Sequence, residues 1–279
     1  MTPLRWLRPG LWRLVRVSAL LWLGLVVLVV LPAPLAAADQ PSLPQLFDQA
    51  LAASRNGRFN EALPLWNQVL ELAPDDAAAW SNRGNVQLAL GEPLAAIADQ
   101  DRAMALDPAS PDPHLNRGTA EEALARWDAA EADYRWILEH AAASDVAQDR
   151  ASALYNLGNV QGSRGDWSAA RASFAAAALA RPGFAMARSS EALVAFELGD
   201  LDAAERELRS LIRRYPLFAD ARAGLTALLW QRGGRGEAES HWVSASGLDP
   251  RYRDPEWLRS IRRWPPGPVK ALQQFLALA

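Results

Sequence analysis

Apolar and small residues recur at steps of three and four along most of the chain, with polar residues between them, as on the buried face of amphipathic helices. Residues 77–110 show the pattern: Trp80 and Gly84 share one face of a first helix, and Ala96 lies on one face of a second. Gly91 interrupts the pattern between them. The segment is therefore expected to form a helical hairpin.

The hairpin pattern repeats with a period of 34 residues, and a proline closes most units because it lacks the N–H that would continue a helix. These prolines are Pro74, Pro108, Pro182, Pro216 and Pro250. One hairpin cannot bury its own apolar stripe, so several copies must stack on one another. The pattern predicts an all-α chain.

With its large residue, small residue four places later, glycine turn, alanines and proline, the chain resembles the tetratricopeptide repeat (TPR) family. Within residues 39–252 we expect six copies, at 43–76, 77–110, 111–144, 151–184, 185–218 and 219–252. Copy three departs from the pattern, because Ala142 replaces the proline and residues 144–150 are extra. We expect these residues to lengthen the next first helix, with Ser144 as its N-cap. The resemblance implies a solenoid that coils into a right-handed superhelix, with a concave groove lined by the first helices.

The tail, residues 253–279, does not match a repeat and is expected to form C-terminal capping helices. One helix is predicted to start at Pro255 and run to about Trp264, and another to cover 269–278 after a proline-rich break. The alternative is that the tail is a docking motif for a partner. Its Trp-Pro-Pro break resembles the end of TPR proteins from cyanobacteria and the thylakoid lumen.

Residues 1–38 have the pattern of a signal peptide. A segment with four arginines and no acid precedes the apolar run 17–31, and the small residues 36–38 form an A-x-A cleavage site. The alternative is a retained membrane anchor, although the run is short for a bilayer. In both cases residues 39–279 are expected to be exported, to the periplasm or thylakoid lumen, and to stay close to the membrane if the signal is retained.

Composition and motifs exclude several function classes. The chain has no cysteine and three scattered histidines, so we expect no metal site and no cofactor. It carries no nucleophile elbow, phosphate loop, zinc-protease or dinucleotide motif, so we expect no enzyme, no catalytic residue and no small-molecule substrate. The acid pair Glu121 and Glu122 is expected on the surface.

Charge is unevenly distributed along the chain. Residues 39–180 hold 20 acids against 10 arginines, whereas residues 181–279 hold 14 arginines and one lysine against 12 acids. A nucleic-acid binder would show a basic stripe, so no nucleic-acid partner is expected.

The candidate binding residues are polar positions that recur on one face of the first helices, since residues three apart share a face. They are Asn82, Asn116 and Asn156 at the sixth position and Asn85, Thr119 and Asn159 at the ninth, with Ser81 and Tyr155 beside them. The family resemblance implies that this face lines the groove, where amides would bridge the N–H and C=O groups of an extended peptide. The alternative is a solvated face, or bonds to a neighbouring helix. We call this series of recurring polar residues the amide ladder. It ends at copy five, where Ser190 and Leu193 take these places.

Arg83 and Arg117 precede the small residue of the first helix, where the family usually has leucine. They are candidates for binding a ligand carboxylate, or for packing with only the head in water. The lysines of a family carboxylate clamp are absent, because Phe47 and Asp112 stand in their places. A clamp for chaperone tails is therefore not expected.

We expect an exported scaffold that binds an extended segment or a helix of another protein, such as a component of envelope or thylakoid complexes under assembly. The alternatives are a structural protein that associates with itself and an accessory subunit of an enzyme.

Overall fold

The computed structural model describes residues 41–140 and 147–278. The predicted signal peptide, 1–38, and the predicted N-cap Ser144 lie outside the described residues. In the part of the chain that is described, every regular element is a helix, and none is long and apolar enough to cross a membrane.

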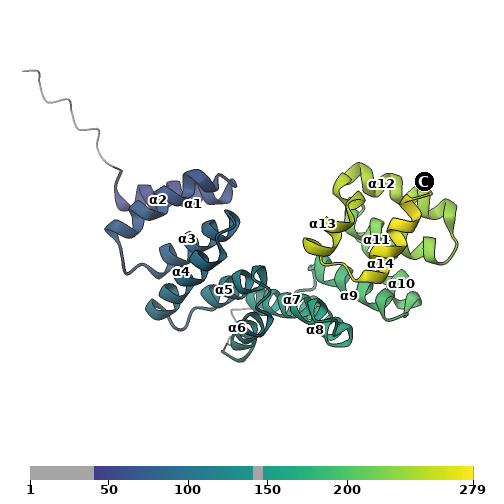
Figure 1. Ribbon diagram of the computed structural model, residues 1–279, viewed down its shortest axis with the longest axis horizontal. Coiled ribbons are helices and arrows are strands. Elements are labelled where there is room, and N and C mark those ends of the chain that lie inside the picture. Colours follow the sequence, from purple (N-terminus) through teal and green to yellow (C-terminus); the bar gives the residue numbers. More distant parts are fainter. Residues whose placement is uncertain (1–40, 141–146, 279) are drawn as a thin grey trace, which may run out of the picture. The chain divides into compact units, whose positions relative to one another are not determined.

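Twelve of the helices pair into hairpins, and helices that follow one another in the chain pack side by side (Figure 1). The pairs are α1 (Leu43–Arg55) with α2 (Phe59–Leu72), α3 (Ala77–Ala89) with α4 (Pro93–Leu106), α5 (Pro111–Ala123) with α6 (Trp127–His140), α7 (Ala147–Ser163) with α8 (Trp167–Ala180), α9 (Ala185–Glu197) with α10 (Leu201–Arg214), and α11 (Ala219–Gln231) with α12 (Arg235–Leu248). The first helices also contact one another, α1 with α3, α3 with α5 and α5 with α7. The predicted all-α solenoid of hairpins is confirmed.

The turn inside each hairpin requires a residue with positive φ. Glycine occupies it in five hairpins, with φ between 70° and 85°, at Gly57, Gly91, Gly165, Gly199 and Gly233. In the α5–α6 hairpin Ala125 holds the position with φ 54°. A non-glycine residue costs about 1–2 kcal/mol there, so this turn is the most strained of the six.

In three hairpins the two helices approach closely at a glycine of the first helix, which is Gly84, Gly118 or Gly158. In α5 that residue is Gly118, on which the ring of Tyr134 from α6 lies. A Cβ at Gly118 would lie 2.5 Å from Tyr134 Cε1, well inside van der Waals contact. Tyr134 is fully buried, so its ring has little room to move away.

We therefore expect Gly118→Ala to lower the free energy of unfolding by about 1–3 kcal/mol through overpacking. Gly247→Ala is the matched control, because Gly247 lies in α12 with nothing within 4 Å of the added Cβ. There alanine should stabilise by roughly 0.5–1 kcal/mol through its higher helix propensity. Urea unfolding followed by circular dichroism measures both. Equal effects of the two substitutions would contradict this account of the hairpin.

The segment before α7 gives this helix 17 residues, against 13 in α3 and α5. The longer first helix agrees with the expectation that the extra residues lengthen it.

The tail forms the 3-10 helix η1 (Pro250–Arg253), α13 (Pro255–Ser260) and α14 (Pro266–Leu276). The predicted bounds are wrong in two places: α13 ends before Trp264, and α14 starts within the prolines. Helix α13 ends at Ser260, and Arg263, three residues later, has a non-helical φ of 53°. Proline fits the first turn of α14, where no N–H is needed.

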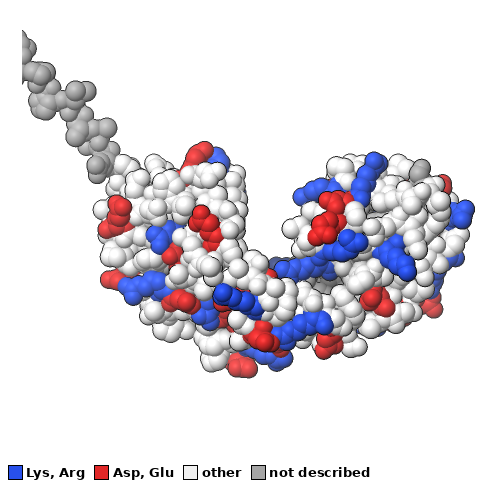
Figure 2. Space-filling view, viewed as in Figure 1, with Lys and Arg blue, Asp and Glu red and all other residues white. Residues whose placement is uncertain are grey.

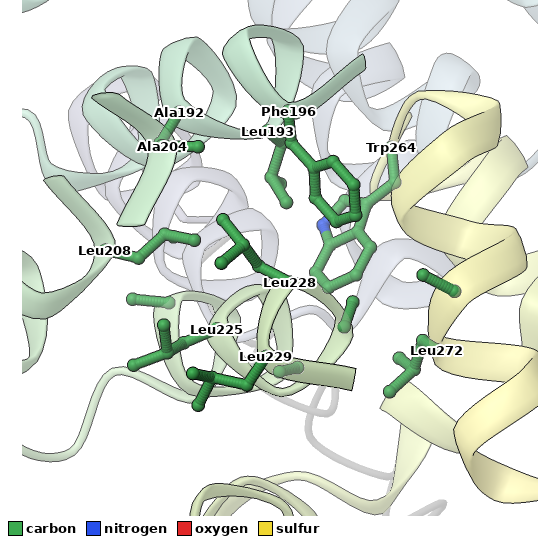
Figure 3. Packing of buried hydrophobic residues seen from close by; sticks show 14 of the residues in the cluster. Ala192, Leu193, Phe196, Ala204, Leu208, Leu225, Leu228, Leu229, Trp264 and Leu272 are labelled. Carbon is green, nitrogen blue, oxygen red and sulfur yellow. The ribbon is translucent and has the colours of Figure 1, made fainter. Parts of the chain in front are cut away.

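The tail packs on the first helices of the last two hairpins. Helix α14 packs on α11 and also on α9, and the backbone N–H of Gly267 donates to Glu197 Oε2 of α9 at 2.6 Å. The largest hydrophobic cluster of the described residues lies here and includes Trp264 of the tail, Phe196 of α9 and Leu228 of α11 (Figure 3). On α12, by contrast, Val243 remains 72% exposed, so the outer side of the last hairpin is open.

Candidate functional site

A groove of about 320 Å³ lies between the first helices α3 and α5. Its polar lining includes four of the predicted binding residues, Ser81, Asn82, Asn85 and Asn116. We call this groove and its lining the α3–α5 groove. The spacing of three residues within a helix and 34 between hairpins accounts for their convergence.

The amides of the groove are only partly occupied by bonds within the chain. Asn82 Nδ2 donates to the Ala78 carbonyl of its own helix at 2.9 Å, and Asn116 Nδ2 donates across to Ser81 Oγ at 3.0 Å. Asn85 is exposed, and its Oδ1 accepts from Gln100 Nε2 at 3.3 Å. Each amide has two donor hydrogens and two acceptor lone pairs, so each keeps bonding capacity toward the groove. Asn116 also fits the alternative prediction, a bond to the neighbouring helix.

The remaining candidates lie outside this groove. Thr119 is exposed and donates to the Leu115 carbonyl of its own helix at 3.0 Å. The Tyr155 ring packs between Phe174 and Phe184, with centroids 5.4 and 5.1 Å away. Half-buried Asn156 and Asn159 lie on α7, and Asn159 lines a second pocket, described below.

Arg83 and Arg117 form ion pairs with the second helix of their own hairpins. Arg83 Nε and Nη2 each lie 2.7 Å from a carboxylate oxygen of Asp99, and Arg117 contacts Asp133 in the same way at 2.9 and 2.7 Å. Asp99 and Asp133 are buried, and the hydrogen bond to Asp133 raises the pKa of Arg117. Each arginine thus faces a buried aspartate of the second helix in its own hairpin. We therefore leave both arginines out of the proposed site.

The prediction that Glu121 and Glu122 lie on the surface is wrong: they are 8% and 6% exposed. Glu122 accepts a hydrogen bond from Tyr134 Oη and pairs with Arg263 of the tail. Burial raises the pKa of Glu122, and the charge of Arg263 limits that rise. The repeat pattern did not predict this burial of Glu122, because its partner Arg263 lies 141 residues further along the chain.

Asp220 of α11, which sequence reasoning also missed, holds the tail in place. It is 1% exposed and accepts hydrogen bonds from four groups. The donors are Ser189 Oγ at 2.6 Å, Arg262 Nη2 at 2.7 Å, Tyr252 Oη at 2.8 Å and Trp264 Nε1 at 3.1 Å. Burial alone would raise the pKa of Asp220, but Arg262 and the hydrogen bonds outweigh it and lower the pKa.

The amide ladder ends where the tail begins to cover the first helices. On α9 the corresponding residues are Ser190 and Leu193, and both are buried. They lie with Phe196 on the helix that Trp264 and α14 cover (Figure 3). The tail thus occupies the first-helix face of α9 and α11, and the α3–α5 groove lies on the uncovered part of that face.

Charged residues of both signs are distributed over the visible surface of the described residues. Figure 2 shows arginines and acids interspersed over the visible face, without a basic stripe. Within residues 41–140 and 147–278 no group of three or more His, Asp or Glu side chains is arranged to hold a metal ion.

Comparison with known proteins finds relatives that are similar in sequence over part of the chain and solved structures that are similar in fold. The TPR repeat-containing thioredoxin TDX of Arabidopsis thaliana is 33% identical over 85 residues, which are 30% of this chain and 22% of the relative. The mitochondrial import receptor subunit TOM34 of Rattus norvegicus is 33% identical over 93 residues, 30% of each chain. The chain thus spans less than a third of the length of these curated relatives.

Solved structures agree in fold. The APC/C hetero-tetramer Cut9–Hcn1 superimposes with a TM-score of 0.65 at 16% identity, over 84% of this chain and 43% of that one. Pseudomonas aeruginosa pilF gives 0.62 at 18% identity, over 75% and 92%. A profile of the tetratricopeptide repeat matches residues 47–111, 155–217 and 189–245, more than half of the sequence. The chain belongs to the tetratricopeptide repeat family.

Proposed function

We propose that this protein is an exported scaffold that holds an extended segment of another protein in the α3–α5 groove. TPR proteins serve as scaffolds for protein interactions. The observation that carries the proposal is the groove itself, whose lining combines three asparagine amides with the Ser81 hydroxyl. Extended backbone offers alternating N–H and C=O groups, and amides are able to pair with both.

The geometry favours a peptide over a compact small molecule. The groove is open to solvent, and its asparagines come from two successive hairpins. Asn82 and Asn85 are three residues apart on α3, and Asn116 reaches in from α5. A linear ligand crossing the two helices would meet all three amides.

The cellular setting is part of the proposal. The signal-peptide pattern of residues 1–38 supports a place in the periplasm or the thylakoid lumen. The resemblance of the tail to those of cyanobacterial and lumenal TPR proteins supports partners among envelope or thylakoid complexes under assembly.

Removing the groove amides should abolish partner binding and leave the fold intact. The test variant is Asn82→Ala/Asn85→Ala/Asn116→Ala, in which only the Asn116–Ser81 and Asn85–Gln100 bonds are lost between elements. These losses should cost about 1–2 kcal/mol together. Crosslinking in the native host, followed by identification of captured chains, should show a partner with the parent and none with the variant.

The matched control removes three exposed amides elsewhere, in Asn60→Ala/Gln68→Ala/Gln274→Ala. It should capture the same partner as the parent. Thermal unfolding of each purified chain checks that the groove variant is folded. A partner retained by the folded groove variant would place the binding site elsewhere.

Self-association is the second candidate, because the outer side of α12 is uncovered and exposes Val243. It predicts an oligomer whose mass rises with concentration and which Val243→Glu disrupts. Sedimentation equilibrium would distinguish it from a monomeric scaffold, in which this substitution changes nothing.

A further inference from the structure

A second pocket, of about 450 Å³, lies where the open first helices meet the tail. One side comes from α7 and the α7–α8 turn, and the other from residues 259–266. It shares no lining residue with the α3–α5 groove. We call it the junction pocket.

The α7 side of the junction pocket is flat and aromatic. Gly158 and Gly162 carry no side chain, and the rings of Phe174 and Trp167 lie directly on them. A Cβ would come within 2.7 Å of Phe174 at Gly158 and within 2.8 Å of Trp167 at Gly162. Because these glycines have no side chains, the two rings pack directly against α7 and leave space in the pocket.

The tail supplies the opposite wall with Trp264 and Pro266. Trp264 is only 4% exposed and donates its only polar hydrogen to buried Asp220, so it presents a small apolar edge, and exposed Pro266 supplies the accessible part of this wall. Tail and hairpin together form a slot between apolar walls. Such a slot favours a flat apolar side chain.

The charged lining of the junction pocket is entirely basic, with Arg164, Arg259 and Arg263 and no acid. Arg164 is paired with Asp128 and Glu131, and Arg263 with Glu122. Arg259 is the least engaged. Its side chain is 49% exposed, 3.6 Å from the exposed carboxylate of Glu256 and 3.3 Å from the amide oxygen of Gln273. A guanidinium with such weak partners is available to a carboxylate.

We propose that the junction pocket binds an acidic segment of a partner protein, with a carboxylate on Arg259 and an adjacent apolar side chain between Trp167 and Pro266. The charge complementarity identifies the occupant, because the pocket lining holds no acid and the guanidinium of Arg259 is only weakly paired. The inference deepens the proposed function by giving the scaffold's partner a chemical class. The tail then contributes one wall of a binding site in addition to capping the solenoid.

The test uses defined peptides and the purified full chain, independently of the native partner. The probe is a fluorescein-labelled, end-capped peptide, Gly-Ser-Asp-Trp-Asp-Leu-Gly-Ser, and fluorescence anisotropy reports its binding. One comparison peptide replaces both aspartates with asparagine, and another replaces tryptophan and leucine with alanine. We expect the probe to bind at least about ten-fold more tightly than either, corresponding to ~1.4 kcal/mol.

Two substitutions test the pocket from different directions. Arg259→Glu reverses the available charge, and Ser163→Trp fills the space from an exposed position in the lining. Each should weaken the probe at least about ten-fold, or ~1.4 kcal/mol. The matched controls are Arg213→Glu and Ser168→Trp, at exposed positions outside the pocket, and they should leave the affinity unchanged.

A peptide that ends in a free carboxylate after the aspartate distinguishes two sources of the charge. Tighter binding than the capped probe would identify a chain terminus as the ligand, and equal binding an internal acidic side chain. The inference is overturned if the neutral peptide binds equally, if no peptide binds, or if Arg213→Glu weakens binding as much as Arg259→Glu.

Failure of this inference is distinguishable from failure of the proposed function. If the groove variant Asn82→Ala/Asn85→Ala/Asn116→Ala loses the probe while Arg259→Glu keeps it, the peptide sits in the α3–α5 groove and the junction pocket is not its site. If the groove variant keeps both the probe and the native partner, the groove assignment fails and the junction pocket stands.

Discussion

Replacing Asp220 with alanine is expected to lower the free energy of unfolding of the C-terminal hairpins by about 3–5 kcal/mol, because it leaves a buried arginine without its counter-charge. The Arg262 side chain is 13% exposed and has Asp220 as its carboxylate partner. The same substitution leaves the hydroxyl of Tyr252 and the indole N–H of Trp264 without their acceptor. The tail should then dock less tightly on α11.

Urea unfolding monitored by circular dichroism measures this loss. The matched control is Asp202→Ala, which removes a carboxylate that is 76% exposed and paired with Arg232. An exposed pair contributes roughly 0–1 kcal/mol, so this variant should unfold close to the parent. Equal losses in the two variants would contradict the role of Asp220 as the anchor of the tail.

The pH dependence gives an independent check with a defined sign. The pKa of Asp220 is lowered in the folded protein, so its ionised form stabilises the fold above the unfolded-state pKa of about 3.9. This contribution is lost as pH falls through the lower folded-state pKa. The stability difference between parent and Asp220→Ala should therefore be constant near neutral pH and shrink below about pH 4.

Local periodicity was sufficient to predict the hairpins, because each depends on residues within one repeat. The ion pairs of Arg83 and Arg117 could also have been predicted from the repeat, because Asp99 and Asp133 lie 34 residues apart, as the two arginines do. An acid that recurs opposite a recurrent arginine indicates an internal pair, which competes with a ligand for that arginine.

Contacts of the tail could not be predicted in this way. Arg263 and Glu122 are separated by 141 residues and Trp264 and Asp220 by 44, and neither separation is a multiple of the repeat. The prolines from Pro265 onward are compatible with both a break and a helix start, and only docking on α11 decides between them. The amide ladder could be predicted from the repeat pattern. That the tail covers the first helices where the ladder ends could not be predicted, because it depends on these distant contacts.

Deleting residues 255–279 is expected to destabilise the last hairpins and leave the first ones unaffected. The deletion removes five large, nearly inaccessible side chains, Leu258, Trp264, Val269, Leu272 and Phe275. At about 1.5–3 kcal/mol for each, the loss should be on the order of 7 kcal/mol or more. It also uncovers Leu193 and Phe196 on α9.

Hydrogen exchange measured by mass spectrometry locates this effect along the chain. In a repeat protein each hairpin contacts its neighbours only, so α9 to α12 should lose protection while α1 to α4 keep theirs. Helix α5 is an informative intermediate, because Glu122 loses Arg263 and keeps only the bond from Tyr134. Deleting residues 277–279 is the control, since Ala277 and Leu278 are exposed and should not matter. Uniform loss of protection over all helices would mean that the solenoid unfolds as one cooperative unit, and unchanged protection of α9 to α12 would mean that the tail does not stabilise the hairpins it covers.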